Sequence, residues 1–415
     1  MDSKELYEAL LGVKQPWSVE RVDMDVARKE VTVTVAHTPK TRFCCPQCGH
    51  DLPVFDHLAE RRWRHLDSCQ FMTFLLARPP RVDCPEHGKL QVNLPWAESG
   101  SRFTNMFEAL AIDVLLAANV KRAAQLLRIT WDEAWGVMQR AVARGRATKK
   151  LTVPEHLGVD EKAIAKGHRY MTLVCDLQHG SVEYVGEERS QASLGAYFEV
   201  FTPVQLKGIQ AISMDMWEPY IKATSAAVPD AKDKIVFDRF HIMQQVLRSL
   251  DRVRRAENKE LRAEGDDTLA RTKYLWLRSA ENVPADATDH FSALKSLTLK
   301  TARAWALKES LRNLWDFRMR GWALRFWKRW YFWATHSQLA PIIEAARTIH
   351  RHLHNVLTFF DHRITNAVAE GLNSKISTIQ KRSCGFRNRD HFKIAVYFHC
   401  GGLSLYPSNL TPRNV

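Results

Sequence analysis

Two short motifs near the start of the chain have the residue types and spacing of metal ligands. Cys45 and Cys48 bracket a tight turn in CPQCG, and Cys84 and His87 repeat that arrangement in CPEHG. Three thiolates and one imidazole form a closed tetrahedral set that is typical of structural zinc, and soft thiolates select zinc over magnesium. The motifs predict one structural Zn²⁺. The alternative is a set of unpaired buried cysteines.

The two motifs are separated by 35 residues, more than a zinc ribbon usually has. The strands between them must therefore form a long excursion. Cys44 and Cys69 lie near the motifs, and we expect them to stay outside the ligand set.

Three acidic residues have positions that suit a second kind of metal site. Asp160 is expected to end the first strand of a sheet and Asp215 the fourth, whereas Glu370 lies on a helix whose polar face also carries Asn366 and Asn373. A helix that crosses the strand ends could bring Glu370 beside both aspartates. Carboxylate oxygens suit Mg²⁺, and two such ions can clamp a displacement at phosphorus. Taken singly, each acid could equally be a surface or capping residue.

Other acids are weaker candidates. Asp238 is expected to end the fifth strand, where it would cap the helix that begins near Arg239 or lie beside the metal site without binding an ion. Glu161, Asp176 and Asp230 are expected to be solvated.

The elements that position these residues can be read from the sequence pattern. Residues 1–100 look rich in strands, because residues 30–35 and much of residues 71–76 alternate in polarity with a period of two. Residues 151–250 suggest three strands followed by strand–helix alternation, which predicts a mixed five-stranded sheet with helices. The fold class is therefore α/β multidomain. The expected domains are 1–100 (zinc ribbon), 101–150 (helix-turn-helix and basic linker), 151–250 and 341–405 (two parts of a catalytic domain), 251–340 (helical insertion) and 406–415 (tail).

Residues 103–145 predict a helix-turn-helix. A short helix over 120–127 and a three-residue turn precede Thr130 and Glu133, whose spacing is that of a capping box opening a third helix. That helix would enter a DNA major groove. The alternative is a three-helix packing that binds no DNA. The expected DNA contacts are Thr130, Trp131, Asp132, Gln139 and Arg140 on bases, Lys121 and Arg122 on phosphates, and Lys149 and Lys150 in the basic linker 144–150.

The charge distribution also favours a nucleic-acid partner. The chain of 415 residues carries a net charge of +14, and 13 of these charges fall in residues 251–415. A surplus of this kind favours a polyanion, although a merely basic protein is the alternative. The sequence has no signal peptide and no apolar run of 18 residues, so we expect a cytoplasmic protein without membrane contact.

The chain resembles the bacterial insertion-sequence transposases of the ISL-three family, of the DDE class, over nearly its whole length. The resemblance rests on CPQCG, CPEHG, the helix-turn-helix, LGVDE, ISMDMW, VFDRFHIMQ and NAVAEGLNSKI followed by KRSCGFRNRDHF. It implies a ribonuclease-H-like catalytic domain interrupted by a helical insertion, with Asp160, Asp215 and Glu370 as the catalytic acids that hold Mg²⁺ or Mn²⁺. It also implies that Asp238 and His241 lie beside the site. His87 and the long ribbon loop depart from the family pattern.

Two further regions have open interpretations. Seven of the 13 tryptophans lie between Trp276 and Trp333, and we expect most of them to form a core. The alternative is a DNA-facing surface made by Trp322, Trp327, Trp330 and Trp333, which lie among Arg320, Arg325, Lys328 and Arg329. Basic residues near the end of the chain are expected to hold phosphates, or else form a solvated face: Lys375, Lys381, Arg382, Arg387 and Arg389.

The sequence thus predicts a transposase, associated with the bacterial nucleoid, that binds the terminal inverted repeats of its element, cuts there and joins the ends to target DNA. Because two ends must meet, a homodimer or higher oligomer on double-stranded DNA is expected. The first alternative is a catalytically silent DNA-binding regulator derived from a transposase. The second is a nuclease or resolvase-like enzyme that cuts without joining.

Overall fold

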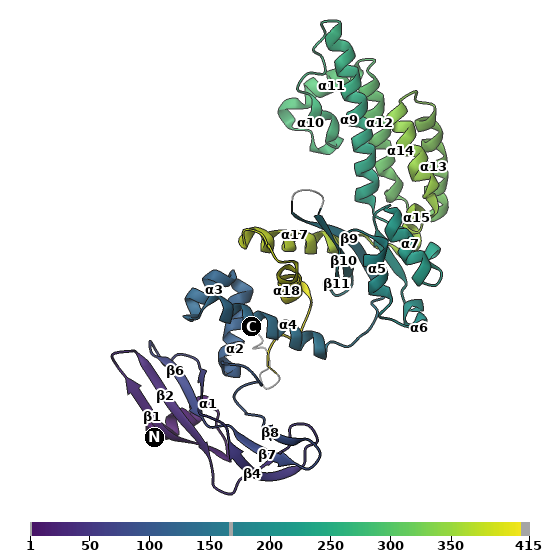
Figure 1. Cartoon of the computed structure of the whole chain (residues 1–415). Helices are drawn as coiled ribbons and strands as arrows, with labels where there is room; N and C mark the ends of the chain where they lie inside the picture. Colours follow the sequence, from purple (N-terminus) through teal and green to yellow (C-terminus); the bar gives the residue numbers. More distant parts are fainter. Residues whose placement is uncertain (1, 166–168, 408–415) are drawn as a thin grey trace. The chain divides into compact units, whose positions relative to one another are not determined.

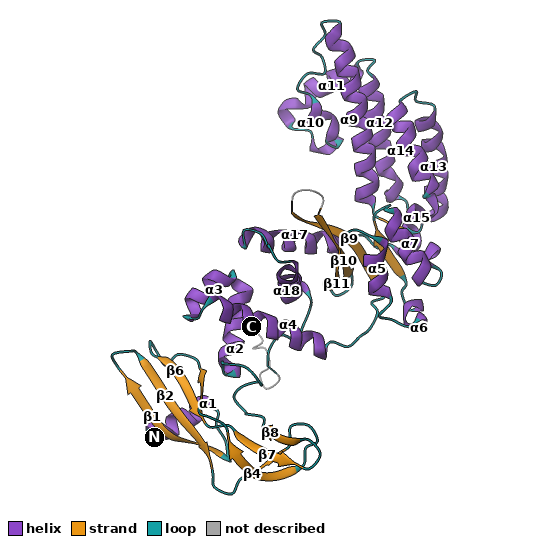
Figure 2. Cartoon of the chain, viewed as in Figure 1, coloured by secondary structure: helices purple, strands orange, loops and turns teal. Residues whose placement is uncertain are grey.

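The computed structural model describes residues 2–165 and 169–407, and the chain folds into two compact units. Unit 1 consists of Met1–Lys149, Asn388–His399 and Leu403–Val415, and unit 2 of Lys150–Arg387 and Cys400–Gly402. None of the described helices combines the length and the apolar character that crossing a bilayer requires. Figures 1 and 2 show the elements of both units.

Unit 1 begins with helix α1 (Ser3–Leu11) and a four-stranded sheet of order β1-β2-β6-β5. Its strands are β1 (Trp17–Asp25), β2 (Glu30–His37), β5 (Arg61–Arg64) and β6 (Met72–Ala77). On β2, Val31, Val33 and Val35 are buried while their neighbours are not, as the alternating sequence predicts. This valine face anchors the N-terminal core.

A second sheet of unit 1 has the order β3-β4-β7-β8 and contains the two cysteine motifs. Its strands are β3 (Arg42–Cys44), β4 (Asp51–His57), β7 (Pro80–Cys84) and β8 (Gly88–Gln91). β5 and β6 lie between β4 and β7 in the sequence but join the first sheet. The expected long excursion between the motifs is therefore confirmed: it is a hairpin that belongs to the neighbouring sheet.

Three helices follow: α2 (Asn105–Ala117), α3 (Val120–Leu127) and α4 (Trp131–Thr148). Thr130 and Glu133 make both halves of the predicted capping box at the start of α4. α4 continues to Thr148, however, so most of the expected basic linker 144–150 is helical. That expectation was wrong because Arg144 is held in a buried ion-pair network.

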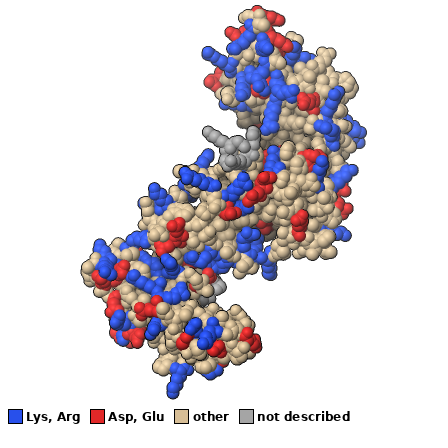
Figure 3. All heavy atoms as spheres, viewed as in Figure 1, with Lys and Arg blue, Asp and Glu red and all other residues tan. Residues whose placement is uncertain are grey.

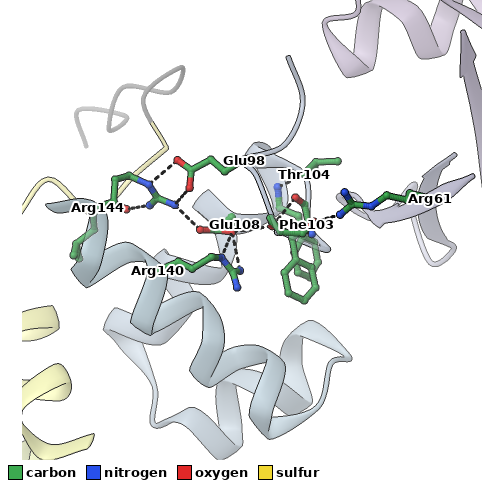
Figure 4. A network of polar contacts seen from close by, with 10 residues as sticks. Arg61, Glu98, Phe103, Thr104, Glu108, Arg140 and Arg144 are labelled. Atoms are coloured by element: carbon green, nitrogen blue, oxygen red, sulfur yellow. Dashed lines mark hydrogen bonds and ion pairs between the residues drawn. The ribbon is translucent and has the colours of Figure 1, made fainter. Parts of the chain in front are cut away.

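The centre of this network is Glu108 of α2, which is 2% exposed (Figure 4). Its carboxylate lies 2.6 Å from the Arg144 guanidinium and 2.9 Å from that of Arg140, both on α4, and Arg144 also pairs with Glu98 at 2.7 Å. A buried carboxylate is costly unless it is paired and hydrogen-bonded. The network therefore fixes α4 against α2.

The end of the chain returns to unit 1. Helix α18 (Arg389–Cys400) places the His391 ring 4.3 Å from the ring of Trp135 on α4. The Tyr406 hydroxyl donates a hydrogen bond of 2.6 Å to Asp113 on α2. His391 and Tyr406 thus pack on the helical domain, and residues 408–415 of the expected tail lie outside the described residues.

Unit 2 contains the mixed five-stranded sheet that the sequence predicts, in the order β11-β10-β9-β12-β13. β9, β10 and β11 pair antiparallel, whereas β12 pairs parallel to both β9 and β13. The strands are β9 (His156–Ala165), β10 (Arg169–Asp176), β11 (Ser181–Glu187), β12 (Ala211–Met214) and β13 (Ile235–Phe237).

Helices surround this sheet and fill the sequence between β13 and the predicted catalytic helix. Four follow the early strands: α5 (Gln191–Phe198), α6 (Pro203–Lys207), α7 (Glu218–Ala227) and α8 (Ala231–Lys234). The later ones are α9 (Arg239–Ala263), α10 (Lys273–Leu277), α11 (Thr288–Ser296), α12 (Lys300–Arg312), α13 (Arg320–Thr335), α14 (Ala340–Arg351), α15 (Leu353–Leu357), α16 (Phe359–His362) and α17 (Ala367–Arg382). The expected boundary at 250/251 falls inside α9, which has no Gly or Pro to interrupt it.

Helices α9, α12, α13 and α14 run side by side (Figure 1) around buried tryptophans. Trp276, Trp327 and Trp330 are at most 2% exposed and belong to a core continuous with that of the sheet. Trp322 and Trp333 are instead exposed. The expectation that most of these tryptophans form a core is thus confirmed, and Trp322 and Trp333 are the exposed exceptions.

Candidate functional site

The two aspartates lie at the same level on neighbouring parallel strands. The last paired residues of β9 and β12 are Gly158 and Ser213. Asp160 lies two residues after Gly158 on β9, and Asp215 lies two residues after Ser213, directly after the end of β12. Asp160 does not end its strand as expected, because β9 continues to Ala165 through its pairing with β10. Asp215 ends its strand as the sequence predicts.

Helix α17 crosses β9 at close range (Figure 1). A Cβ atom at Gly158 would lie 2.9 Å from the Asn366 amide oxygen and 3.2 Å from the Ala369 Cβ, so only glycine permits this approach. The Asn373 amide donates a hydrogen bond of 2.6 Å to Asp160 Oδ2. The polar face expected on this helix therefore meets the strand that carries Asp160. Val368 on the same helix, for which the helical spacing predicts burial, is exposed instead.

Glu370 lies in the first turn of α17, exposed at the surface. Its pKa is raised by partial burial and then by the negative charges of Asp238 and Asp160. The pKa of Asp160 is raised above all by burial and, to a lesser degree, by Asp215. The charged forms of Asp160 and Glu370 are thus disfavoured by burial and by neighbouring negative charges.

The carboxylate oxygens of Asp160, Asp215 and Glu370 nevertheless do not all lie within 4.8 Å of one another. Among the described residues, two groups bring three or more metal-ligating atoms within 4.8 Å of one another, and neither includes Asp160, Asp215 or Glu370. Like charges held close together repel, which is a physical reason for the wider spacing of three carboxylates.

Arg189 was missed by the sequence analysis. Its guanidinium lies 3.1 Å from a Glu161 oxygen, 3.2 Å from Asp215 Oδ2 and 4.1 Å from the centre of the Trp217 ring. No motif marks it, since it lies 26 residues before Asp215; ISMDMW contains its partners Asp215 and Trp217 but not Arg189 itself. Glu161 was expected to be solvated, but it is largely buried against Arg189, and burial raises its pKa.

Asp238 and His241 flank the acids at the start of α9. Asp238 occupies the position before the helix, but its side chain makes no capping hydrogen bond, so the capping interpretation is wrong. The side chain is 5% exposed, its Oδ2 atom has no hydrogen-bond partner, and burial raises its pKa. His241 Nδ1 lies 3.5 Å from Asp215 Oδ2.

The four zinc-ligand candidates come together in unit 1. The sulfurs of Cys45, Cys48 and Cys84 and a ring nitrogen of His87 all lie within 4.8 Å of one another, on the β3–β4 and β7–β8 turns. A backbone N–H of Cys48 lowers the pKa of Cys45 to about 6, which favours the thiolate that metals bind. Cys44 and Cys69 are exposed and stay outside this group, as expected.

The residues expected to contact DNA differ in whether their side chains are exposed or already paired within the protein. Lys121, Arg122, Trp131, Gln139, Lys149 and Lys150 are exposed. Arg140 is instead paired with Glu108, and the Thr130 hydroxyl is engaged in the capping box. Arg140 therefore needs to leave a buried carboxylate before it can read a base, which argues against the predicted role.

The basic residues near the chain end also divide. Lys375, Lys381 and Arg382 lie on the second half of α17, all exposed. Arg387 still belongs to unit 2, whereas Arg389 begins α18 in unit 1. The five residues therefore do not form a set within one unit.

Comparison with known families assigns three consecutive parts of the chain. Residues 41–87 match the zinc-finger of the transposases of IS204, IS1001, IS1096 and IS1165, and this range contains all four zinc-ligand candidates. Residues 92–142 match the helix-turn-helix domain of transposase family ISL3, and residues 157–396 match the transposase domain of that family. The last match alone covers more than half of the chain.

Two similar proteins extend along almost the full length. The transposase for insertion sequence element IS1001 of Bordetella parapertussis is 26% identical over 406 residues, which are 95% of this chain and 98% of that protein. The transposase for insertion sequence element IS1557 of Mycobacterium tuberculosis is 27% identical over 428 residues, 94% and 93% of the two chains. The zinc ribbon, the helix-turn-helix and the transposase domain occur in one order along this chain, which therefore belongs to the ISL3 family of insertion-sequence transposases.

Proposed function

We propose that this transposase binds the terminal inverted repeats of its element and carries out metal-dependent strand cleavage and strand transfer at an acidic triad of Asp160, Asp215 and Glu370. The observation that carries the proposal is the hydrogen bond from Asn373 to Asp160. It ties the helix of Glu370 to the strand of Asp160, beside the strand that ends at Asp215.

The proposed catalytic domain has a ribonuclease-H-like fold interrupted by a helical insertion. Support comes from three antiparallel strands followed by two parallel ones, with the central strand β9 carrying the first acid. Helices α9 to α16 then separate β13 from α17 in the sequence. This arrangement accounts for the 155 residues between Asp215 and Glu370.

The donor set fits a hard divalent cation. The candidates are carboxylate oxygens, and three nearby acceptor atoms are buried without a hydrogen-bond donor: Glu161 Oε2, Asp238 Oδ2 and Asn373 Oδ1. Positive charge would relieve the raised pKa values of the acids. When bound, two Mg²⁺ or Mn²⁺ ions would supply Lewis-acid stabilisation of the attacking and leaving oxygens at phosphorus.

The chain's own residues prepare this site. Asn373 fixes the orientation of the Asp160 carboxylate, leaving the acid's other oxygen to accept from the Glu161 N–H at 2.8 Å. Arg189 supplies a fixed positive charge between Glu161 and Asp215, and its stacking on Trp217 holds it there. We propose that Asp238 and His241 support the site in the same way, without ligating an ion.

Recognition is assigned to unit 1. One structural Zn²⁺ held by Cys45, Cys48, Cys84 and His87 would lock the two ribbon hairpins together. The exposed side chains of α3 and α4 would meet the duplex, with Lys121 and Arg122 on phosphates and Gln139 on a base edge. The proposed partners are double-stranded element ends, target DNA and a second copy of this chain, in the bacterial cytoplasm at the nucleoid.

A reconstituted reaction tests the proposal. Labelled DNA that carries the element's own end is incubated with a target plasmid and Mg²⁺, using wild type, Asp215→Ala and, as a matched control, Asp286→Ala, an exposed acid of unit 2. We expect wild type and the control to cut at the element boundary and join the end to the plasmid, while Asp215→Ala binds without cutting. Cutting by Asp215→Ala at the wild-type rate would overturn the assignment.

A further inference from the structure

Helix α13 presents an exposed face of aromatic and basic side chains that no part of the proposed reaction uses. Trp322 is 55% exposed, Phe332 64% and Trp333 44%, although large aromatics are normally buried. Together with Arg325 and Arg329 they fall at intervals of three, four and seven residues, which places them on one side of the helix.

The charge of this region is one-sided. Residues 317–343 contain five Lys and Arg and no Asp or Glu. Two nearby acids have partners: Asp361 pairs with Arg320 at the start of α13, and Glu344 lies 2.8 Å from Arg252 on α9. Within the described residues no ion pair holds Arg325, Lys328 or Arg329, and the Arg325 guanidinium instead covers the Trp322 ring at 4.7 Å. Lys and Arg side chains are also spread over the face that Figure 3 shows.

We propose that this face of α13 binds a DNA strand with unpaired bases. The absence of acids in this stretch and the unpaired cations favour a polyanion. The exposed rings decide which one, because in a duplex the faces of the bases are stacked inside, whereas a single strand offers each base for stacking on an aromatic side chain. Trp322 and Trp333 are eleven residues apart, roughly 16 Å along the helix axis, a span of about five stacked nucleotides.

The inference rests on the proposed function, since strand cleavage produces free ends that can unpair. It gives α13, and with it the helical insertion, the role of binding such an unpaired end. It predicts that the affinity for single strands and the affinity for the element's duplex end are lost by different substitutions, because the former depends on α13 and the latter on the helix-turn-helix.

The test measures fluorescence anisotropy of a labelled single-stranded oligodeoxythymidylate with the full-length protein, without added Mg²⁺. We expect Trp322→Ala combined with Trp333→Ala to weaken binding at least about 10-fold, while Trp322→Tyr with Trp333→Tyr retains most of it. Tyr274→Ala removes a ring of similar exposure beside Lys273 on α10 and should change nothing. Lys328→Ala with Arg329→Ala should reduce the slope of log affinity against log salt by about 1.4.

Two results would overturn the inference. One is single-strand affinity in the double alanine variant equal to that of wild type. The other is a loss of self-association by light scattering in that variant with unchanged single-strand binding, which would make the face an interface between copies. The duplex end serves as a separate arm: if wild type binds the oligodeoxythymidylate through α13 but does not bind the element end, the proposed function fails while the binding face remains.

Discussion

At the scale of single residues, the candidate site depends on side chains that hold other side chains in place. Asn373 orients Asp160, Arg189 bridges Glu161 and Asp215, and Gly158 leaves room for α17 to approach. Each of these residues acts through geometry rather than by contacting DNA. Their loss should therefore weaken catalysis more than it weakens DNA binding.

Asn373→Ala tests the first of these contacts. Removing the amide frees the Asp160 carboxylate to rotate and unties α17 from β9, so we expect cleavage of the element end to slow about 10- to 100-fold, with a higher Mg²⁺ requirement. Ser374→Ala, an exposed neighbour on the same helix, is the control. Cleavage rates across a Mg²⁺ titration provide the measurement, and an Asn373→Ala rate equal to that of the control would contradict the positioning role.

The sequence predicted the residues whose chemistry is visible in their type and missed those defined by tertiary contact. The polar face of Asn366, Glu370 and Asn373 follows from helical spacing. Arg189 could not be predicted, because its partners come from two separate segments: Glu161 from β9, and Asp215 and Trp217 from the loop after β12. Asp238 looked like a helix cap from its position, but its buried side chain makes no capping hydrogen bond.

At the scale of elements, the zinc ribbon is the part that the chain's own packing supports least. The β3–β4 and β7–β8 turns meet at the cysteine cluster, where a metal would join them. The neighbouring sheet buries Val31, Val33 and Val35 in a hydrophobic cluster that also includes Val82 of β7, so we expect that sheet to stay folded when the cysteine cluster is lost.

Cys84→Ser should therefore release zinc and unfold the ribbon locally. We expect less than half of the wild-type zinc content and weaker binding to the element end, because a structural zinc contributes folding free energy directly. Zinc is measured by a colorimetric chelator after denaturation. Cys69→Ser, an exposed cysteine outside the cluster, should bind a full equivalent; equal zinc in both variants would exclude Cys84 as a ligand.

A second element-scale prediction concerns His65, which joins β5 to the start of α2 through a hydrogen bond of 2.9 Å with Thr104. Burial lowers the pKa of His65 to about 4, whereas an unfolded histidine titrates near 6.5. The folded state therefore excludes a proton that the unfolded state binds. Stability of unit 1 should fall as pH drops from about 6.5 towards 4, by about 3 kcal/mol in all.

His65→Gln should flatten this part of the pH profile, since glutamine can keep the hydrogen bond without titrating. Denaturant unfolding at several pH values between 7 and 5 measures the effect, and His290→Gln, at an exposed position, should retain the wild-type slope. An unchanged slope in His65→Gln would show that other groups, such as the zinc ligands, cause the acid instability.

The elements themselves followed the sequence closely where local signals were strong. The sequence predicted α3 to the residue, and the capping box predicted the first residue of α4. Turn glycines bound the ribbon hairpins. The segment RGRATKK looked like a linker because of its charge. It is helical because Arg144 pairs with Glu98 and Glu108, a tertiary contact that no local pattern encodes.

At the scale of the whole molecule, the proposed DNA-binding unit and the proposed catalytic unit are each built from more than one segment of the sequence. α17 belongs to unit 2, and α18, only a few residues later, packs in unit 1 against Trp135 of the helix-turn-helix. Residues 383–388 thus join α17, which carries Glu370, to α18, which packs against the proposed DNA-reading helix α4. A linear division into domains could not predict this return, because it depends on contacts between segments more than 200 residues apart.

The most direct test of the central claim replaces a proposed ligand by a softer one. Asp215→Cys is compared with wild type and Asp215→Ala in the cleavage reaction, with Mg²⁺ or Mn²⁺ as the only added ion. Thiolates bind Mg²⁺ poorly and accept softer cations better, so we predict that Asp215→Cys is inactive with Mg²⁺ and regains activity with Mn²⁺, whereas Asp215→Ala stays inactive with both. Equal activity of Asp215→Cys with either ion, or cleavage by Asp215→Ala, would contradict a metal-ligating role for Asp215 and with it the proposed triad.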